Sequence, residues 1–296
     1  MYDVAILGCG PAGLTASIYA SRYGLNPIVL YSKFGGMTVE AYIVENYPGF
    51  ESINGLDLIK KIFNHAKKFG GKFIEEEIKE VKKEKGFFIL RSEKNTYKAK
   101  SLIIATGTEK RKLGIKNEEK FIGKGLSYCF SCDAPFYKGK IVGVIGGSSS
   151  AAKAAIYLSD IAKKVYLIYR REKLRAEPIL IEQIGKKKNI EVLYNTIVEK
   201  LEGKEFLEYV VTNKGKLVID GMFVEIGGVP SNAIALQLGV KLDENGFIIV
   251  DREMRTNVEG VFAAGDITNN TLKQIITAAA QGAVAAFTAY NFLKKI

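Results

Sequence analysis

A glycine-rich turn near the start of the chain restricts the fold more than any other feature of the sequence. Residues 2–7 form an apolar, strand-like run, Gly8-Cys9-Gly10-Pro11-Ala12-Gly13 follows, and residues 14–23 have helical spacing. In Gly-x-Gly-x-x-Gly the first glycine permits a tight turn, the second lets backbone approach a pyrophosphate, and the third lets helix and strand pack closely. The sequence therefore predicts a Rossmann-like dinucleotide-binding unit, with Gly8, Gly10, Pro11, Ala12 and Gly13 at the nucleotide.

The same succession of elements recurs in the middle of the chain. A strand-like run over 140–145 leads into Gly146-Gly147-Ser148-Ser149-Ser150-Ala151, and a helical pattern over 152–161 and a strand over 165–169 follow. Ser148 stands where the second glycine is expected, so its Cβ would crowd a pyrophosphate, while its hydroxyl could donate to it. We expect a second nucleotide-binding unit that uses Gly146, Ser148 and Ser149.

Three arginines come directly after the last of these strands, at positions 170, 171 and 175. Guanidinium groups at this point suit the 2′-phosphate of NADPH, so Arg170, Arg171 and Arg175 favour NADPH over NADH. The alternative is that these arginines only solvate the end of the strand.

Several stretches outside the two turns carry groups suited to a flavin nucleotide. The apolar run over 101–107 ends in Ala-Thr-Gly, and the run over 260–266 ends in Gly-Asp, whose carboxylate could accept hydrogen bonds from ribityl hydroxyls. A long alanine-rich helix then opens at residues 273–275, and its N-terminus could stabilise negative charge on a reduced flavin. Two loops punctuated by glycine and proline, 35–37 and 45–49, add Gly36 and Asn46, whose amide suits a polar ring. The expected binding residues are Gly36, Asn46, Ala105, Thr106, Gly107, Gly265, Asp266, Gln274 and Ile275.

Two cysteines three positions apart lie between the two glycine turns. Cys129 and Cys132 form a Cys-x-x-Cys unit, and Asp133, a possible proton donor, follows at once. Such a pair can close a disulfide, and its surroundings commonly favour the thiolate. Half of a zinc site is the alternative, but Cys9 and His65 are the only other soft ligands in the sequence, so we expect no metal site. Cys129, Cys132 and Asp133 are the predicted catalytic residues.

The chain carries 43 Lys and Arg against 32 Asp and Glu, a formal charge of +11. A nucleic-acid-binding protein is the alternative class that this charge raises, but the lysines are dispersed and no recognition helix or RNA-binding motif accompanies them. No apolar stretch approaches the roughly 20 residues of a membrane span. Cysteine usage and the lack of an apolar leader predict a cytoplasmic protein that binds neither nucleic acid nor membrane.

Taken in order, these residues resemble the low-molecular-weight thioredoxin reductase family over nearly the whole chain. The agreeing motifs are Gly8-x-Gly10-x-x-Gly13, Glu45-Asn46-Tyr47-Pro48-Gly49, Ala105-Thr106-Gly107, Cys129-x-x-Cys132-Asp133, Arg170-Arg171-x-x-x-Arg175-Ala176 and Gly265-Asp266. The resemblance implies an α/β fold of two Rossmann-like, three-layer nucleotide-binding domains, the second inserted into the first. Residues 1–110 and 229–296 would bind FAD, and residues 111–228 would bind NADPH and carry the cysteine pair.

The resemblance also implies the role of each catalytic residue. Cys132 would lie against FAD, Cys129 would attack the disulfide of a thioredoxin or glutaredoxin-like protein, and Asp133 would exchange protons with the thiolates. Members of the family form homodimers, so the resemblance implies a homodimer here.

The sequence departs from the family pattern mainly in the half expected to bind NADPH. Ser148 replaces a glycine, Lys153 and Ala154 stand where acids are usual, and Tyr169 takes the place of the usual histidine. Met37 likewise replaces a common glutamine in the other half. NADH, ferredoxin or another reduced carrier therefore stays open as the electron donor, with NADPH preferred because the three arginines remain.

Overall fold

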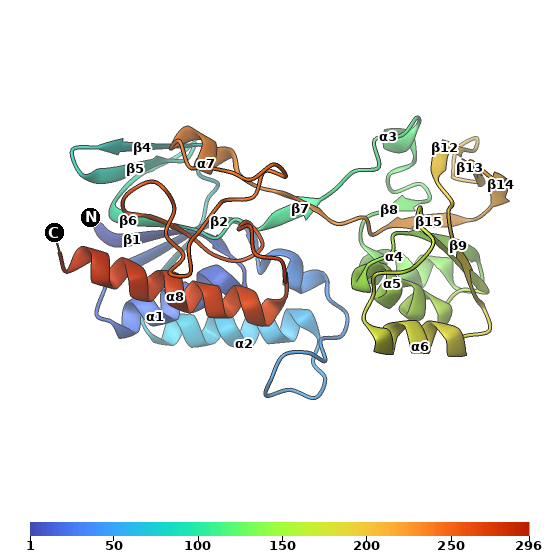
Figure 1. Cartoon of the computed structure of the whole chain (residues 1–296), viewed down its shortest axis with the longest axis horizontal. Helices are drawn as coiled ribbons and strands as arrows, with labels where there is room; N and C mark the ends of the chain where they lie inside the picture. Colours follow the sequence, from blue (N-terminus) through green and yellow to red (C-terminus); the bar gives the residue numbers. More distant parts are fainter. Residues whose placement is uncertain (296) are drawn as a thin grey trace. The chain divides into compact units, whose positions relative to one another are not determined.

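The structure, a computed structural model, describes residues 1–295 and divides the chain into two compact units (Figure 1). Residues 1–109 together with 229–296 form unit 1, and residues 110–228 form unit 2. Each unit has a largely parallel sheet with helices packed against it. The expected α/β class is confirmed, as is the insertion of one Rossmann-like unit into another.

Unit 1 is built on a seven-stranded sheet with strand order β3-β2-β1-β6-β5-β4, and β17 also pairs with β6. Its central pairings are parallel, whereas β4, β5 and β6 pair antiparallel at one edge. The strands are β1 (Tyr2–Cys9), β2 (Pro27–Phe34), β3 (Lys72–Glu75), β4 (Glu80–Glu84), β5 (Phe87–Arg91), β6 (Thr96–Ile104) and β17 (Val261–Ala263). The helices are α1 (Pro11–Arg22), the 3-10 helix η1 (Gly36–Glu40), α2 (Gly55–Lys68), α7 (Ala233–Gln237) and α8 (Ile275–Leu293).

Strand β1 is buried on both of its faces. Val4 and Ile6 belong to the core that includes residues of α1 and α8, whereas Ala5 and Leu7 belong to the core on the opposite face. Side chains alternate along a strand, so a central parallel strand needs an unbroken apolar run. This is why the first residues of the chain read as a buried strand.

Helix α8 packs closely on the start of α1. A Cβ on Gly282 would lie 2.1 Å from the carbonyl oxygen of Ala12 and 3.1 Å from its Cα, so the approach requires glycine. Ala278, Ala285 and Ala289 of α8 are buried as well. Because Ala12 lies in the first turn of α1, α8 holds the glycine turn that precedes this helix.

Unit 2 contains a parallel five-stranded sheet with order β11-β10-β9-β15-β8 and an antiparallel three-stranded sheet, β12-β13-β14. The strands are β8 (Leu126–Ser127), β9 (Ile141–Ile145), β10 (Lys164–Ile168), β11 (Ile190–Leu193), β12 (Val198–Glu202), β13 (Tyr209–Thr212), β14 (Gly215–Val218) and β15 (Gly221–Val224). The helices are α3 (Glu118–Phe121), α4 (Phe130–Asp133), the 3-10 helix η2 (Ala134–Tyr137), α5 (Ser149–Ser159) and α6 (Pro178–Lys186). Where the chain passes between the units, β7 (Thr108–Lys110) pairs with β16 (Gly228–Pro230).

Both helices that follow a glycine turn begin earlier than the apolar spacing predicts. Helix α1 starts at Pro11 and α5 at Ser149, whereas the sequence patterns begin at 14 and 152. Proline suits a first helical position because its φ is preset and it needs no N–H partner. Small and polar residues in a first turn carry no apolar periodicity, so the pattern missed them. The last residues of each fingerprint are therefore helical.

Cys9 and His65, the two further soft ligands in the sequence, lie in contrasting surroundings. Cys9 is 1% exposed, and burial raises the pKa of its thiol to about 12, so it is a packed side chain and not a nucleophile. His65 lies exposed on α2, with its ring centroid 5.3 Å from that of Phe69.

Over residues 1–295, no helix is both long enough and apolar enough to cross a membrane.

Replacing Gly282 with alanine should destabilise the protein, because the new Cβ would push α8 away from Ala12. Overpacking of this kind costs about 1–3 kcal/mol. Gly185→Ala is the matched control, since Gly185 lies in α6 with nothing within 4 Å of its added Cβ. That change should stabilise the protein by about 0.5–1 kcal/mol. Urea unfolding of both variants measures the difference, and equal midpoints would contradict the close packing.

Candidate functional site

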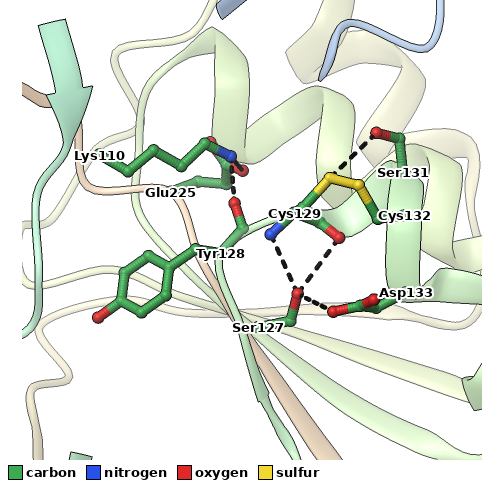
Figure 2. The surroundings of a disulfide bond; sticks show 8 residues. All are labelled: Lys110, Ser127, Tyr128, Cys129, Ser131, Cys132, Asp133 and Glu225. Carbon is green, nitrogen blue, oxygen red and sulfur yellow. Dashed lines mark hydrogen bonds and ion pairs between the residues drawn. A yellow bond between two sulfur atoms is a disulfide. The ribbon is translucent and has the colours of Figure 1, made fainter. Parts of the chain in front are cut away.

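The cysteine pair closes a disulfide at the C-terminal end of β8. Cys129 and Cys132 are joined by an S–S bond of 2.07 Å, with their Cα atoms 5.4 Å apart (Figure 2). Cys129 directly precedes helix α4, which contains Cys132. Cys132 is exposed, and Cys129 is half-buried. The two cysteines therefore lie close enough to form the disulfide that the redox interpretation requires.

Ser127 ties the predicted proton donor to the cysteine loop. Its hydroxyl donates to Oδ2 of Asp133 at 2.6 Å and accepts a hydrogen bond from the backbone N–H of Cys129 at 3.0 Å (Figure 2). The backbone N–H of Asp133 donates to the carbonyl of Cys129 at 3.2 Å. Ser127 is only 4% exposed, so its hydroxyl is a fixed support. The sequence did not identify Ser127, because no spacing rule links it to Asp133.

A buried ion pair lies beside the same loop. Lys110 Nζ is 3.1 Å from Oε1 of Glu225 and also donates to the carbonyl oxygen of Tyr128, the residue before Cys129 (Figure 2). The side chains of Lys110 and Glu225 are 17% and 9% exposed. Partly buried pairs of this kind are screened less by salt than surface pairs. This second support was also missed, since its members are far apart in the sequence.

Glu118 anchors the side chain of Tyr128. The Tyr128 hydroxyl and the backbone N–H of Gly114 both donate to the Glu118 carboxylate. Burial works to raise the pKa of Glu118, but these hydrogen bonds outweigh it and hold that pKa below its ordinary value. Burial, followed by the bond to Glu118, raises the pKa of Tyr128. The phenol therefore remains a neutral donor to an ionised carboxylate.

The first glycine turn has space that the protein itself does not fill. A Cβ on Gly8 would lie 2.2 Å from the carbonyl oxygen of Ala105, and one on Gly13 would lie 2.0 Å from that of Gly8. By contrast, a Cβ on Gly10 would meet only the Gly35 carbonyl oxygen, at 3.9 Å, and one on Gly36 only Gly10 Cα, at 3.7 Å. Close packing thus explains why positions 8 and 13 are glycine. At Gly10 the space beside the backbone is open, which fits the close approach of a pyrophosphate.

Other predicted flavin-binding residues of unit 1 contact one another or a neighbouring lysine. Asn46 Nδ2 donates to Oε1 of Gln274 at 3.0 Å, although the two are 228 positions apart. Burial raises the pKa of Asp266, and Lys273 Nζ donates to the Asp266 carbonyl oxygen at 3.0 Å. Lys273 was not among the predicted binding residues. The cofactor-binding roles of all these residues remain predictions.

The first glycine of the second turn makes the same kind of close backbone contact as Gly8 does in the first turn. A Cβ on Gly146 would lie 2.2 Å from the carbonyl oxygen of Glu225, and Ser148 is the extended N-cap of α5. The turn is tied to the arginine segment, because the N–H of Arg175 donates to the Gly147 carbonyl at 2.7 Å. Likewise, Ser149 Oγ accepts from the N–H of Glu177 at 3.1 Å.

The three arginines of this segment all have exposed side chains, and within residues 1–295 none of them forms an ion pair. Unpaired guanidinium groups beside a phosphate-type turn fit an anionic ligand. Nucleotide binding by Arg170, Arg171 and Arg175 remains a prediction.

Glu118→Gln should destabilise the protein at neutral pH and much less in acid. A carboxylate whose pKa is lowered in the folded state contributes stability above its ordinary value of 4.5, and that contribution is lost as pH falls through the lowered value. Losing charge-assisted bonds should cost about 1.5–3 kcal/mol at pH 7. Urea unfolding at a series of pH values from 7 down to 2 tests this, with the exposed Glu119→Gln as control. A loss of stability that stays equal over the whole series would contradict it.

Comparison with known proteins identifies the family to which this architecture belongs. Residues 2–282 match the family described as Pyridine nucleotide-disulphide oxidoreductase. A curated thioredoxin reductase of Listeria monocytogenes is 40% identical over 304 residues, covering 100% of this chain and 95% of the relative. The solved thioredoxin reductase of Lactococcus lactis (FR conformation) has a TM-score of 0.97 and 34% identity, with all of both chains covered. That of T. acidophilum has a TM-score of 0.93 and 39% identity, with 98% of each chain covered. The resemblance seen in the sequence is therefore confirmed, and the chain belongs to the pyridine nucleotide-disulphide oxidoreductase family.

Proposed function

We propose that the chain is a thioredoxin-disulfide reductase that passes electrons from NADPH through FAD and the Cys129–Cys132 pair to a thioredoxin-like protein. The observation that carries the proposal is the disulfide itself, which has one exposed sulfur-bearing residue and a carboxylate held beside it. The similarity to thioredoxin reductases over the full chain supports the same function.

Residues of both units supply the cofactor sites in this proposal. In unit 1, the turn from Gly8 to Gly13 would hold the FAD pyrophosphate, and Asp266 would accept from ribityl hydroxyls. In unit 2, the turn that begins at Gly146 would hold NADPH, and Arg170 and Arg171 would bind its 2′-phosphate. When bound, FAD would supply two-electron chemistry that links a hydride donor to a disulfide.

The chain's own residues then carry out thiol–disulfide exchange. In the reduced pair, the Cys129 thiolate attacks one sulfur of the partner's disulfide, and the other sulfur of the partner leaves as a thiolate. The Cys132 thiolate next attacks Cys129, which releases the partner's second thiolate and restores the Cys129–Cys132 bond. Two electrons pass to the partner, and its two thiolates take up two protons. These protons come from the Cys129 and Cys132 thiols as each ionises, and Asp133, positioned by Ser127, carries them one at a time to the partner's thiolates.

The partner and the assembly are also part of the proposal. Phe136 is 73% exposed only four residues after Cys132, so an apolar side chain is available to a thioredoxin or glutaredoxin-like protein at the disulfide. We expect a homodimer, which light scattering of the purified protein would measure. A cytoplasmic location is expected from the cysteine usage.

Cys132→Ser should abolish reduction of thioredoxin while FAD remains bound, because Cys129 alone cannot complete the exchange. Cys9→Ala is the matched control, since it removes the remaining thiol, which is buried in unit 1. Thioredoxin-dependent oxidation of NADPH and the visible flavin spectrum are measured for both variants. Retained turnover in Cys132→Ser would exclude the role given to this cysteine.

The donor is identified by adding stoichiometric NADPH, and then NADH, to the flavin-loaded protein without oxygen. We expect NADPH to bleach the flavin absorption rapidly. The double variant Arg170→Ala, Arg171→Ala should need at least tenfold more NADPH and be little changed toward NADH, because charge-assisted bonds to the 2′-phosphate are lost. Lys173→Ala is the control for charge in the same exposed segment. If dithionite bleaches the flavin but neither NADPH nor NADH does, the electron donor would be ferredoxin or another reduced carrier.

A further inference from the structure

The hydroxyl of Tyr169 is a buried polar group that the mechanism above does not use. Tyr169 is 5% exposed, and its Oη atom is buried without a hydrogen-bond partner among residues 1–295. Buried hydroxyls are nearly always hydrogen-bonded, so an exception calls for a physical explanation. Tyr169 is the first residue after β10, at the carboxyl end of the parallel sheet of unit 2. Ligands bind at this end of such sheets.

The ring of Tyr169 covers the second glycine turn. A Cβ built on Gly147 would lie 2.3–2.4 Å from the Cε2, Cδ2 and Cζ atoms of Tyr169. Gly147 is therefore required by this ring and not by its own backbone conformation, because its φ is not positive. Cζ is the atom that carries the hydroxyl, so the Oη end of the ring lies at the turn.

The backbone holds Tyr169 in this position from both sides. Its N–H donates to the Leu193 carbonyl, and its carbonyl accepts from the N–H of Thr196, both at 3.0 Å. The ring also packs in the core cluster that includes Ala151 and Leu174. A rotation of the ring out to solvent would break this packing, so the hydroxyl stays at the turn.

Two polar groups of the glycine turn have hydrogen-bond partners other than Tyr169. The Gly147 carbonyl accepts from Arg175, and Ser149 Oγ accepts from Glu177. Oη is thus a donor without an acceptor, at a turn of the type that binds pyrophosphate, whose oxygens are acceptors only.

We propose that Tyr169 Oη donates a hydrogen bond to the pyrophosphate of a dinucleotide bound on the turn from Gly146 to Ala151. This inference rests on the proposed nucleotide-binding role of unit 2. The ring lies on the glycine turn, whereas the arginines follow the strand at positions 170, 171 and 175. Tyr169 therefore binds the pyrophosphate, which NADPH and NADH share, whereas the arginines bind the 2′-phosphate, which only NADPH has.

Tyr169→Phe tests the inference, because it removes the hydroxyl and leaves the ring over Gly147. Binding of NADP⁺ and of NAD⁺ to the flavin-loaded protein is measured by calorimetry, which requires no turnover. We expect both nucleotides to bind roughly tenfold more weakly, as for the loss of a hydrogen bond to a charged group. The nucleotide-free variant should unfold at a temperature no lower than wild type, since an unsatisfied buried group has been removed. Tyr166→Phe is the matched control, because Tyr166 lies on β10 but packs in the other core cluster of unit 2.

Several results would overturn the inference. If the wild type binds both nucleotides and Tyr169→Phe binds them equally well, Oη does not contact the nucleotide. The proposal that NADPH is the electron donor would then still stand. Weaker binding of NADP⁺ alone would move the contact to the 2′-phosphate and away from the pyrophosphate. A lower unfolding temperature without nucleotide would show that Oη already has a partner, such as an ordered water. A wild type that binds neither nucleotide would refute the proposed donor and this inference together.

Discussion

The close approach of a glycine turn to the carbonyl oxygen at the end of a neighbouring strand is the contact on which both halves of this protein depend. Gly8 makes it with Ala105 in unit 1, and Gly146 makes it with Glu225 in unit 2. In each case a Cβ would lie 2.2 Å from that oxygen. The contact turns the chain sharply from strand into helix and directs the first N–H groups of the helix toward the ligand side.

Glu225 connects this contact to the redox chemistry within unit 2. Its carbonyl oxygen faces Gly146, and its carboxylate pairs with Lys110, which also donates to the carbonyl of Tyr128 beside Cys129. Ser127 holds Asp133 from the other side of the loop. The disulfide thus lies on a loop held by part-buried polar bonds. A fixed loop of this kind would preserve the geometry that exchange with a partner requires.

The departures of unit 2 from the usual fingerprint are coordinated in space. Tyr169 fills the volume above Gly147, and the backbone of Arg175 closes the turn from the next segment. Ser148 is accommodated in extended backbone at the N-cap of α5, without positive φ. A turn that departs from the usual motif is therefore closely packed, and a buried hydroxyl without a partner among residues 1–295 belongs to the residue that replaces the usual histidine.

The sequence by itself determined the α/β class, the two nucleotide turns and the redox cysteine pair, because each depends on local spacing: apolar runs for buried strands, glycines for tight turns and a three-residue cysteine interval. Only the tertiary structure decided which side chains support the site. Lys110 meets Glu225, and Tyr169 meets Gly147, through the order of strands in a sheet, which no local pattern encodes. Ser127 and Asp133 are near in sequence, and their contact depends on the conformation of the loop between β8 and α4. Long-range hydrogen bonds and ring contacts depend on where distant segments end, and that position is set by packing of the whole unit.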